Sequence, residues 1–222
     1  MGEAVGAMLV SAVGIAISPL ALVTVVLMLA TPRGRACGAA FTAGWVAGLA
    51  GVVAVVVLAG GGTGPGGAAP TWSSWLRLAL GALFVLLAAK QWRDRPREGH
   101  VAAPPEWMRA VDRFTPGRSA GLGVVLVAAN PKNLVLAVGG AASIATSGAG
   151  PGGEAAAGAL MVLVGSLCTL VPLGVDLLGG DRSARVLGEW KAWMAAHNTA
   201  ITTTVLAVLG AKYLGDALTA LA

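Results

Sequence analysis

Long apolar runs dominate the pattern of this chain, and short polar or glycine-rich links separate them. Six of the runs reach about 20 residues, the length that an α-helix needs to cross the hydrocarbon core of a bilayer. These runs lie at roughly 4–30, 35–59, 72–92, 118–146, 155–179 and 197–221. The pattern therefore predicts an all-α integral membrane protein with six transmembrane helices.

The links between these runs alternate in charge. The links at 60–70 and 147–154 contain no lysine or arginine. The other three contain the basic residues Arg33 and Arg35, then Arg93, Arg95, Arg97, Arg109, Arg113 and Arg118, then Arg182, Arg185 and Lys191. Because basic links stay in the cytoplasm, we expect a multi-pass protein of the cytoplasmic (inner) membrane with both termini outside.

Three helices in each half predict an inverted architecture. An odd number of spans makes the second half start on the opposite side of the membrane from the first. We therefore expect residues 1–92 and 118–222 to form two inverted three-helix repeats, joined by a basic cytoplasmic link at 93–117.

Two stretches outside the apolar runs have the pattern of short interfacial helices. In the long link, Trp107, Val111 and Phe114 recur at helical spacing with charged residues opposite them. The stretch from Ser183 to Met194 carries a similar apolar face. Such helices lie at the membrane surface, where they anchor the chain to lipid or offer a surface to a cytoplasmic partner.

Two proline motifs occupy matching places in the two halves. One is Ile17-Ser18-Pro19-Leu20 in the first run, and the other is Ala129-Asn130-Pro131-Lys132-Asn133 in the fourth run. Proline lacks a backbone donor and breaks the helical hydrogen-bond ladder, and inside lipid the freed groups need protein or a water-filled cavity. We therefore expect helices one and four to be broken at these prolines, with the two breaks meeting near the membrane centre as in inverted-repeat transporters.

The candidate substrate-binding residues lie at these two breaks. They are Ser18, Pro19, Asn130, Pro131, Lys132 and Asn133. Lys132 is ionisable inside a predicted span, which is costly and marks a functional candidate by default. It can bind an anionic headgroup or pair with Asp176 in the fifth run. The amides of Asn130 and Asn133 and the hydroxyl of Ser18 can bind a ligand, repair the broken ladder, or do both.

Asp176 is the candidate proton-coupling residue. A carboxylate inside a span can alternate between its protonated and charged forms during a transport cycle. The alternative is a static ion pair with Lys132 that only holds the fourth and fifth spans together. In the last run Lys212 and Asp216 are one turn apart, and we expect Lys212 to pair with Asp216 or to snorkel.

A stripe of small residues marks the second run. Ala36, Ala40, Gly44 and Gly48 recur every four residues on one face. Small residues let helix backbones approach closely in membranes. The stripe predicts close packing within the chain, and the seam of a homodimer is the alternative.

Composition agrees with a membrane protein. Hydrophobic residues make up 56% and charged residues 11% of the 222 residues, with a mean hydropathy of +0.79, whereas a soluble domain carries about 25% charged residues. The net charge of +5 comes largely from the basic links, so it indicates topology and attraction to anionic lipid, not a nucleic-acid partner. The N-terminus lacks the basic segment of a signal peptide, so the first run is expected to be a retained helix.

No enzyme or metal constellation is present in the sequence, and we expect no catalytic activity, cofactor or metal. His100 and His197 belong to no cluster with metal-ligand spacing, and the sequence contains neither a nucleophile elbow nor a phosphate-binding loop. Cys37 and Cys168 imply no disulfide framework. Their positions are not equivalent in the two halves, which disfavours a thiol–disulfide electron carrier.

The sequence resembles the lysine-exporter (LysE) superfamily. The resemblance depends on six spans, Ser18-Pro19 in the first and Asn130-Pro131-Lys132-Asn133 in the fourth, and it covers nearly the whole chain. Within the superfamily the chain is most similar to the peptidoglycolipid-addressing (GAP) proteins, which include the sulfolipid-addressing proteins of actinobacteria. Many members carry an acidic residue just before the first proline, where this chain has Ser18.

This resemblance implies export of a lipid or glycolipid of the cell envelope across the inner membrane, driven by proton flux. The implied partners are the lipid substrate, membrane lipids and envelope-lipid biosynthesis proteins. Export of amino acids or other small solutes is one alternative, and a non-transporting scaffold for envelope-lipid enzymes is another. The paired proline breaks and Lys132 favour transport, since a scaffold needs neither.

Overall fold

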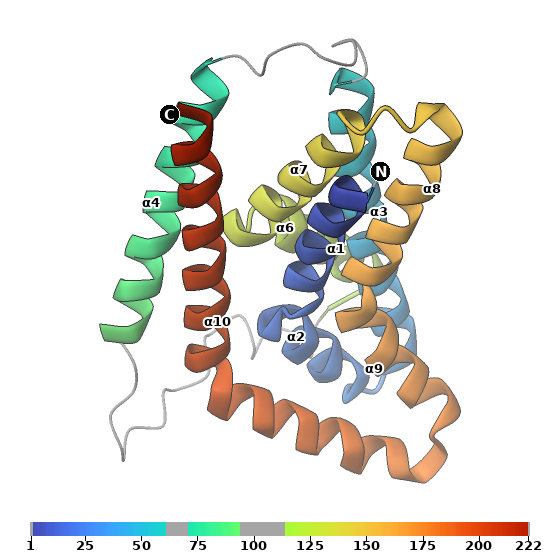
Figure 1. Cartoon of the computed structure of the whole chain (residues 1–222). Helices are drawn as coiled ribbons and strands as arrows, with labels where there is room; N and C mark the ends of the chain where they lie inside the picture. Colours follow the sequence, from blue (N-terminus) through green and yellow to red (C-terminus); the bar gives the residue numbers. More distant parts are fainter. Residues whose placement is uncertain (1, 61–70, 94–113, 222) are drawn as a thin grey trace. The chain divides into compact units, whose positions relative to one another are not determined.

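The computed structural model describes residues 2–60, 71–93 and 114–221, and the regular structure in these ranges is helical throughout (Figure 1). The helices are α1 (Gly2–Ala16), α2 (Pro19–Leu29), α3 (Gly34–Gly60), α4 (Thr71–Arg93), α6 (Pro116–Ala128), α7 (Pro131–Ala145), α8 (Gly150–Gly165), α9 (Leu167–Leu178), the short 3-10 helix η2 (Gly180–Arg182) and α10 (Ser183–Leu221). The predicted all-α class is confirmed.

Several of these helices can cross a membrane. By length and composition α3 and the segment Thr199–Thr219 of α10 each suffice alone, and three bent pairs qualify if each pair counts as one span. The described residues therefore offer up to five spans, and the chain is a membrane protein. Helix α4 forms where the third span was expected but is not among these five, so the count of six stays a prediction, as do the orientation and the inverted symmetry.

The two predicted proline breaks are present. The helix axis bends by 44° between α1 and α2 and by 69° between α6 and α7. Ser18 and Asn130, the residues before the prolines, have extended backbones with ψ of 96° and 112°, because the proline ring excludes the helical conformation from the preceding residue. Pro19 and Pro131 then begin the next helices, where a missing N–H costs nothing.

A third bend, of 60°, separates α8 from α9 and was not anticipated, because the run at 155–179 was expected to form one continuous helix. No proline lies at the bend. The amide of Ser166 is shared between the carbonyls of Val162 and Leu163, and the Thr169 amide bonds the Ser166 carbonyl, so the ladder tightens locally to 3-10 spacing. The Gly165-Ser166 pair at this point is a recognised cause of sharp kinks.

The two stretches with interfacial patterns have different outcomes. Residues 94–113 lie outside the described ranges, so the helix expected around Trp107 and Val111 stays a prediction. The stretch from Ser183 to Met194 is helical, but it is the beginning of the 39-residue helix α10 and continues into the last apolar run. It is therefore not the separate short helix that was expected.

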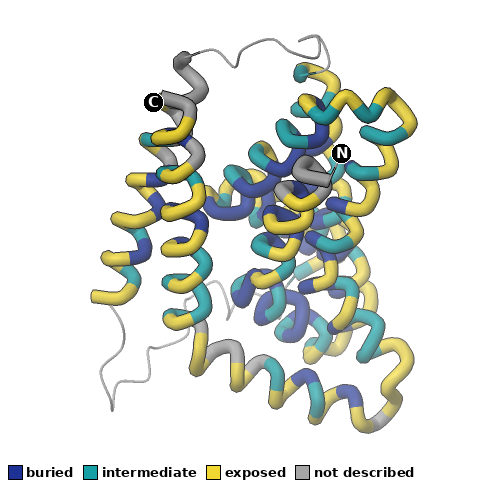
Figure 2. Tube along the Cα trace, viewed as in Figure 1, coloured by how far each residue is buried: buried dark blue, intermediate teal, exposed yellow. Residues whose placement is uncertain are grey.

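The chain divides into two compact units. The larger holds residues 1–65 and 104–195, and the smaller holds 66–103 and 196–222. In the larger unit α7 packs along α1, α3 packs on α6, and α2 packs on α9 (Figure 1). Figure 2 shows α2 as largely buried, together with facing stretches of α3 and α7. In the smaller unit Phe84 and Tyr213 join α4 to α10 with ring centroids 6.0 Å apart.

The small-residue stripe packs within the chain. A Cβ atom added at Gly44 would overlap the backbone of Ala120 in α6, and one at Gly48 would lie 3.1 Å from the Cα of Val124. Gly123 makes the reciprocal approach to the backbone of α3. Gly44 and Gly48 therefore allow close helix packing within the chain, which was the first of the two interpretations.

Candidate functional site at the helix breaks

Lys132 joins the two proline breaks. Its residue is only 9% exposed, in the first turn of α7, and its Nζ donates a hydrogen bond to the carbonyl oxygen of Ile17 at 2.7 Å. Ile17 precedes Ser18-Pro19, so an ammonium from one break bonds a carbonyl at the other, 115 residues away in the sequence. Such a carbonyl needs a partner inside a membrane, and a buried ammonium needs an acceptor. The two breaks therefore lie side by side as expected, and their position near the membrane centre stays a prediction.

The two asparagines repair the ladder at the fourth predicted span. Asn130 Oδ1 accepts from the amide of Lys132 at 3.1 Å and caps α7. Asn133 Nδ2 donates to the carbonyl of Leu126 at 3.2 Å, in the last turn of α6. Asn133 is 1% exposed, and its Oδ1 is buried without a hydrogen-bond partner. Repair is thus their structural role, and the Asn133 carbonyl oxygen keeps an unused acceptor.

Ser18 and Pro19 build the other break differently. Both are buried, Ser18 with 3% exposure, and Ser18 occupies the N-cap position of α2. Its side chain makes no capping hydrogen bond, in contrast to Asn130. Pro131, by comparison, is exposed. The first break therefore depends on Lys132 from α7 rather than on its own cap.

The third break adds polar residues that the sequence analysis did not select. Trp45 Nε1 on α3 donates to the Gly165 carbonyl at 3.3 Å, and the Thr169 hydroxyl donates to the Ser166 carbonyl at 3.0 Å. Ser166 is fully buried, and its hydroxyl has no hydrogen-bond partner. The buried hydroxyl of Thr42 on α3 also lacks a hydrogen-bond partner. The Gly-Ser pair was the available signal for this bend.

The third break borders the other two. Ile15 of α1 lies 3.5 Å from the position that a Cβ of Gly165 would occupy. Cys168, 5% exposed, lies in the first turn of α9, directly after this bend. We call Ser18, Lys132, Asn133, Ser166, Cys168 and Thr169 the break cluster. These residues are all buried, in a part of the chain made mostly of apolar helices.

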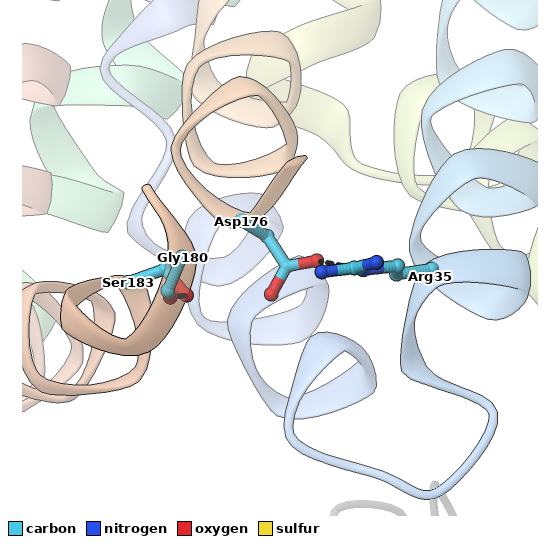
Figure 3. A network of polar contacts seen from close by, with 4 residues as sticks. All are labelled: Arg35, Asp176, Gly180 and Ser183. Atoms are coloured by element: carbon cyan, nitrogen blue, oxygen red, sulfur yellow. Dashed lines mark hydrogen bonds and ion pairs between the residues drawn. The ribbon is translucent and has the colours of Figure 1, made fainter. Parts of the chain in front are cut away.

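Asp176 does not pair with Lys132. Its Oδ2 lies 3.3 Å from Nε of Arg35 at the start of α3, and Figure 3 shows the two side chains pointing toward each other. The Asp176 side chain is 16% exposed and that of Arg35 is 71% exposed. A cleft of about 440 Å³ lies here, lined by Asp176 and the α2–α3 turn. The ion pair therefore holds α9 to α3 beside an open cleft.

The remaining candidates lie elsewhere. The Lys212 ammonium is 5.8 Å from the centroid of the Tyr213 ring, and the side chain of Asp216 is outside the described part. Cys37 and Cys168 are free thiols, and Cys37 Sγ donates to the carbonyl of Phe114 at 3.4 Å. Among the described residues no group of three or more His, Cys, Asp or Glu side chains could hold a metal ion.

A comparison with protein-family models matches residues 8–219 to the family described as Sap, sulfolipid-1-addressing protein. The chain belongs to this family. The match covers all three helix breaks, and the resemblance to the sulfolipid-addressing proteins is confirmed. No curated protein and no solved structure matches the chain.

Proposed function

We propose that this protein is an inner-membrane transporter that exports a lipid or glycolipid of the cell envelope. One observation carries the proposal: Lys132, buried at one helix break, bonds the Ile17 carbonyl at the other. Broken helices that meet inside a membrane are the usual framework of a transport site. Membership of the sulfolipid-1-addressing family supports a lipid as the cargo.

Lys132 would bind an anionic headgroup. An ammonium has three donors, and the N-terminus of α7 adds backbone amides with a favourable dipole. A sulfated headgroup, which the family description suggests, is an anion of this kind. In this mechanism the headgroup competes with the Ile17 carbonyl for the Lys132 ammonium, so that cargo binding loosens the contact between the two breaks.

In the proposed transport cycle, proton flux would supply the driving force by protonating and deprotonating Asp176. In its charged form the carboxylate holds Arg35, and so holds α9 to α3. Protonation would remove this attraction and release Arg35. We propose that this switch couples the proton to the movement of the broken helices, in a six-span inverted repeat with both termini outside and with neither cofactor nor catalytic activity. A homodimer and envelope-lipid biosynthesis proteins are the partners we would look for.

Two other functions are distinguishable. An exporter of amino acids or other small solutes would use the same breaks for a smaller cargo. A non-transporting scaffold would recruit envelope-lipid enzymes through its links, and it would not need a buried ammonium. Lys132 therefore favours transport over the scaffold.

The deciding experiment is a lipid profile of cells that lack the protein. We expect one envelope lipid to accumulate in the inner membrane and to be depleted from the cell surface, and the wild-type protein to restore its export. An unchanged surface profile together with altered amino-acid efflux would establish the small-solute function instead. Loss of synthesis of the lipid, rather than of its export, would indicate the scaffold.

A further inference from the structure

An apolar groove runs between α3 and α8 in the larger compact unit, with a volume of about 520 Å³. The two helices run antiparallel along it, since Trp45 bonds Gly165 while Val53 lies beside Gly158. Ser166 therefore lies at the Val46 end of the groove, and Glu154 lies at the Val57 end. Small side chains, among them Ala50 and Ala159, line the groove.

The dimensions and the position of the groove fit a lipid tail. Its volume falls within the range of about 300–1,000 Å³ that is usual for ligand pockets. From Val46 to Val57 the wall extends roughly 16 Å at 1.5 Å per helical residue. Helix α3 is apolar and long enough to cross a membrane by itself, and the groove extends along its second half.

One polar group in the groove lacks a partner. Ser166 lines the groove, is fully buried, and has an Oγ without a hydrogen bond. A buried hydroxyl without a partner is costly, and a plain hydrocarbon chain would leave it so. An occupant with an ester or amide oxygen at this level would satisfy it.

The depth of Ser166 indicates which lipid this is. Val46, at the same end of the groove, lies close to the middle of α3 (Gly34–Gly60), so Ser166 is level with the middle of the span that α3 is long enough to form. A resident phospholipid keeps its ester oxygens at the membrane interface and places only hydrocarbon at this depth. Ser166 also belongs to the third helix break, where Gly165 borders Ile15, two residues before the Ile17 carbonyl that Lys132 bonds.

We propose that this groove holds an acyl chain of the exported lipid while its headgroup occupies the break cluster. The Ser166 hydroxyl donates a hydrogen bond to the carbonyl oxygen of the ester or amide that joins the chain to the headgroup. The polar part of the cargo thus crosses among buried polar residues, and its tail remains in hydrocarbon. This inference rests on the proposed lipid export and adds the site that receives the tail.

Photocrosslinking tests the occupant. Cells receive a fatty acid that carries a diazirine and an alkyne, and the full-length protein is purified after irradiation and its adducts are mapped by mass spectrometry. We expect adducts to concentrate on groove residues such as Val53 and Val57, relative to Val55 and Leu58 on the same helix, which are 67% and 82% exposed outside the groove. The attached lipid should be one class enriched over bulk phospholipid. Equal labelling of both sets, or adducts with the composition of the surrounding membrane, would overturn the proposal.

Three variants sharpen the test. Ala159→Trp fills the groove and should abolish the adducts there, whereas Ala156→Trp, on an exposed part of α8 outside the groove, should leave them. Ser166→Ala should lower groove labelling about fivefold, the equivalent of one neutral hydrogen bond, without lowering the melting temperature, because its hydroxyl has no partner in the protein. Unchanged labelling in Ser166→Ala would remove Ser166 from the site.

The groove and the proposed function can fail separately. Normal export by the wild-type protein without groove adducts would refute the groove and leave lipid export intact. Groove adducts of one lipid class in a protein whose deletion changes no surface lipid would refute export and leave tail binding.

Discussion

Lys132 concentrates the chemistry of this protein in one side chain. A charged group inside a membrane is costly and persists where it has a partner and a function. Here the partner is the Ile17 carbonyl, at 2.7 Å, and the environment is a cluster of buried polar residues at three helix breaks. A fixed structural bond could be supplied by a neutral side chain. An ammonium that can be drawn away by an anion suits a binding site better.

Replacing Lys132 with Met tests this role. The variant keeps the length of the side chain and removes its charge. Losing a charged hydrogen bond to the cargo costs about 1.5–3 kcal/mol, so we expect export to fall roughly 10- to 100-fold while the protein still reaches the membrane. Lys90→Met, an equal change at an exposed position of α4, is the control. Export at the wild-type rate in Lys132→Met would reduce Lys132 to a packing residue.

Asp176 allows a second test at this scale, because a coupling group and a static ion pair predict different results. Asp176→Asn mimics the protonated form at nearly constant volume. If Asp176 carries the proton, export against a gradient should fail and its pH dependence should flatten. Arg35→Gln removes the same ion pair but keeps the carboxylate, so its export should remain pH-dependent.

If the pair is only structural, both variants should behave alike. An ion pair whose arginine is 71% exposed is worth about 0–1 kcal/mol, so each variant should lose only a few degrees of melting temperature and retain the wild-type pH profile. Export and melting measured on the same preparations separate the two roles. An unchanged pH profile in Asp176→Asn would end the coupling hypothesis.

At the scale of elements, the local causes could be predicted and the distant ones could not. Pro19 and Pro131 break their helices for reasons that lie within a few residues, and both breaks were expected. The bend at Ser166 has a weaker local cause, a Gly-Ser pair, inside a run that otherwise reads as one helix. Side-chain partners that depend on tertiary packing could not be predicted from the sequence. Asp176 bonds Arg35, 141 residues away, instead of Lys132.

The contact between α3 and α6 provides a prediction for an element. Gly44→Ala would place a methyl group against the backbone of Ala120, and backbone atoms cannot move aside cheaply. We expect a loss of about 1–3 kcal/mol of stability from this overpacking. Gly51→Ala on the same helix meets nothing within 4 Å and should be neutral or stabilising by up to about 1 kcal/mol. Equal melting temperatures for the two variants would contradict the close approach.

At the scale of the whole molecule, composition and run length were enough for the class. A charged fraction of 11% and a mean hydropathy of +0.79 indicate a membrane protein, and helices cover all six expected runs, although α8 begins at Gly150 and α10 at Ser183, ahead of the runs expected at 155–179 and 197–221. The division of the chain into two compact units could not be predicted from the sequence. It groups segments from both ends of the sequence, residues 1–65 with 104–195 and 66–103 with 196–222, and such grouping depends on contacts that no local pattern encodes.

Topology is the prediction that belongs to this scale. The basic links keep three segments in the cytoplasm if the positive-inside rule holds, which leaves the termini and the links at 60–70 and 147–154 outside. Single cysteines are introduced into a variant in which Cys37 and Cys168 are replaced by alanine, and intact cells are treated with a membrane-impermeant maleimide. We expect Thr63→Cys and Ser147→Cys to be labelled in intact cells, and Ala102→Cys only after permeabilisation.

The reverse labelling pattern would mean the opposite orientation in the membrane and would place the Arg35–Asp176 pair on the outer face. A mixed pattern, with Thr63 and Ser147 on opposite sides, would mean an odd number of crossings between them, and the six-span inverted repeat would then be wrong even if Lys132 proved essential.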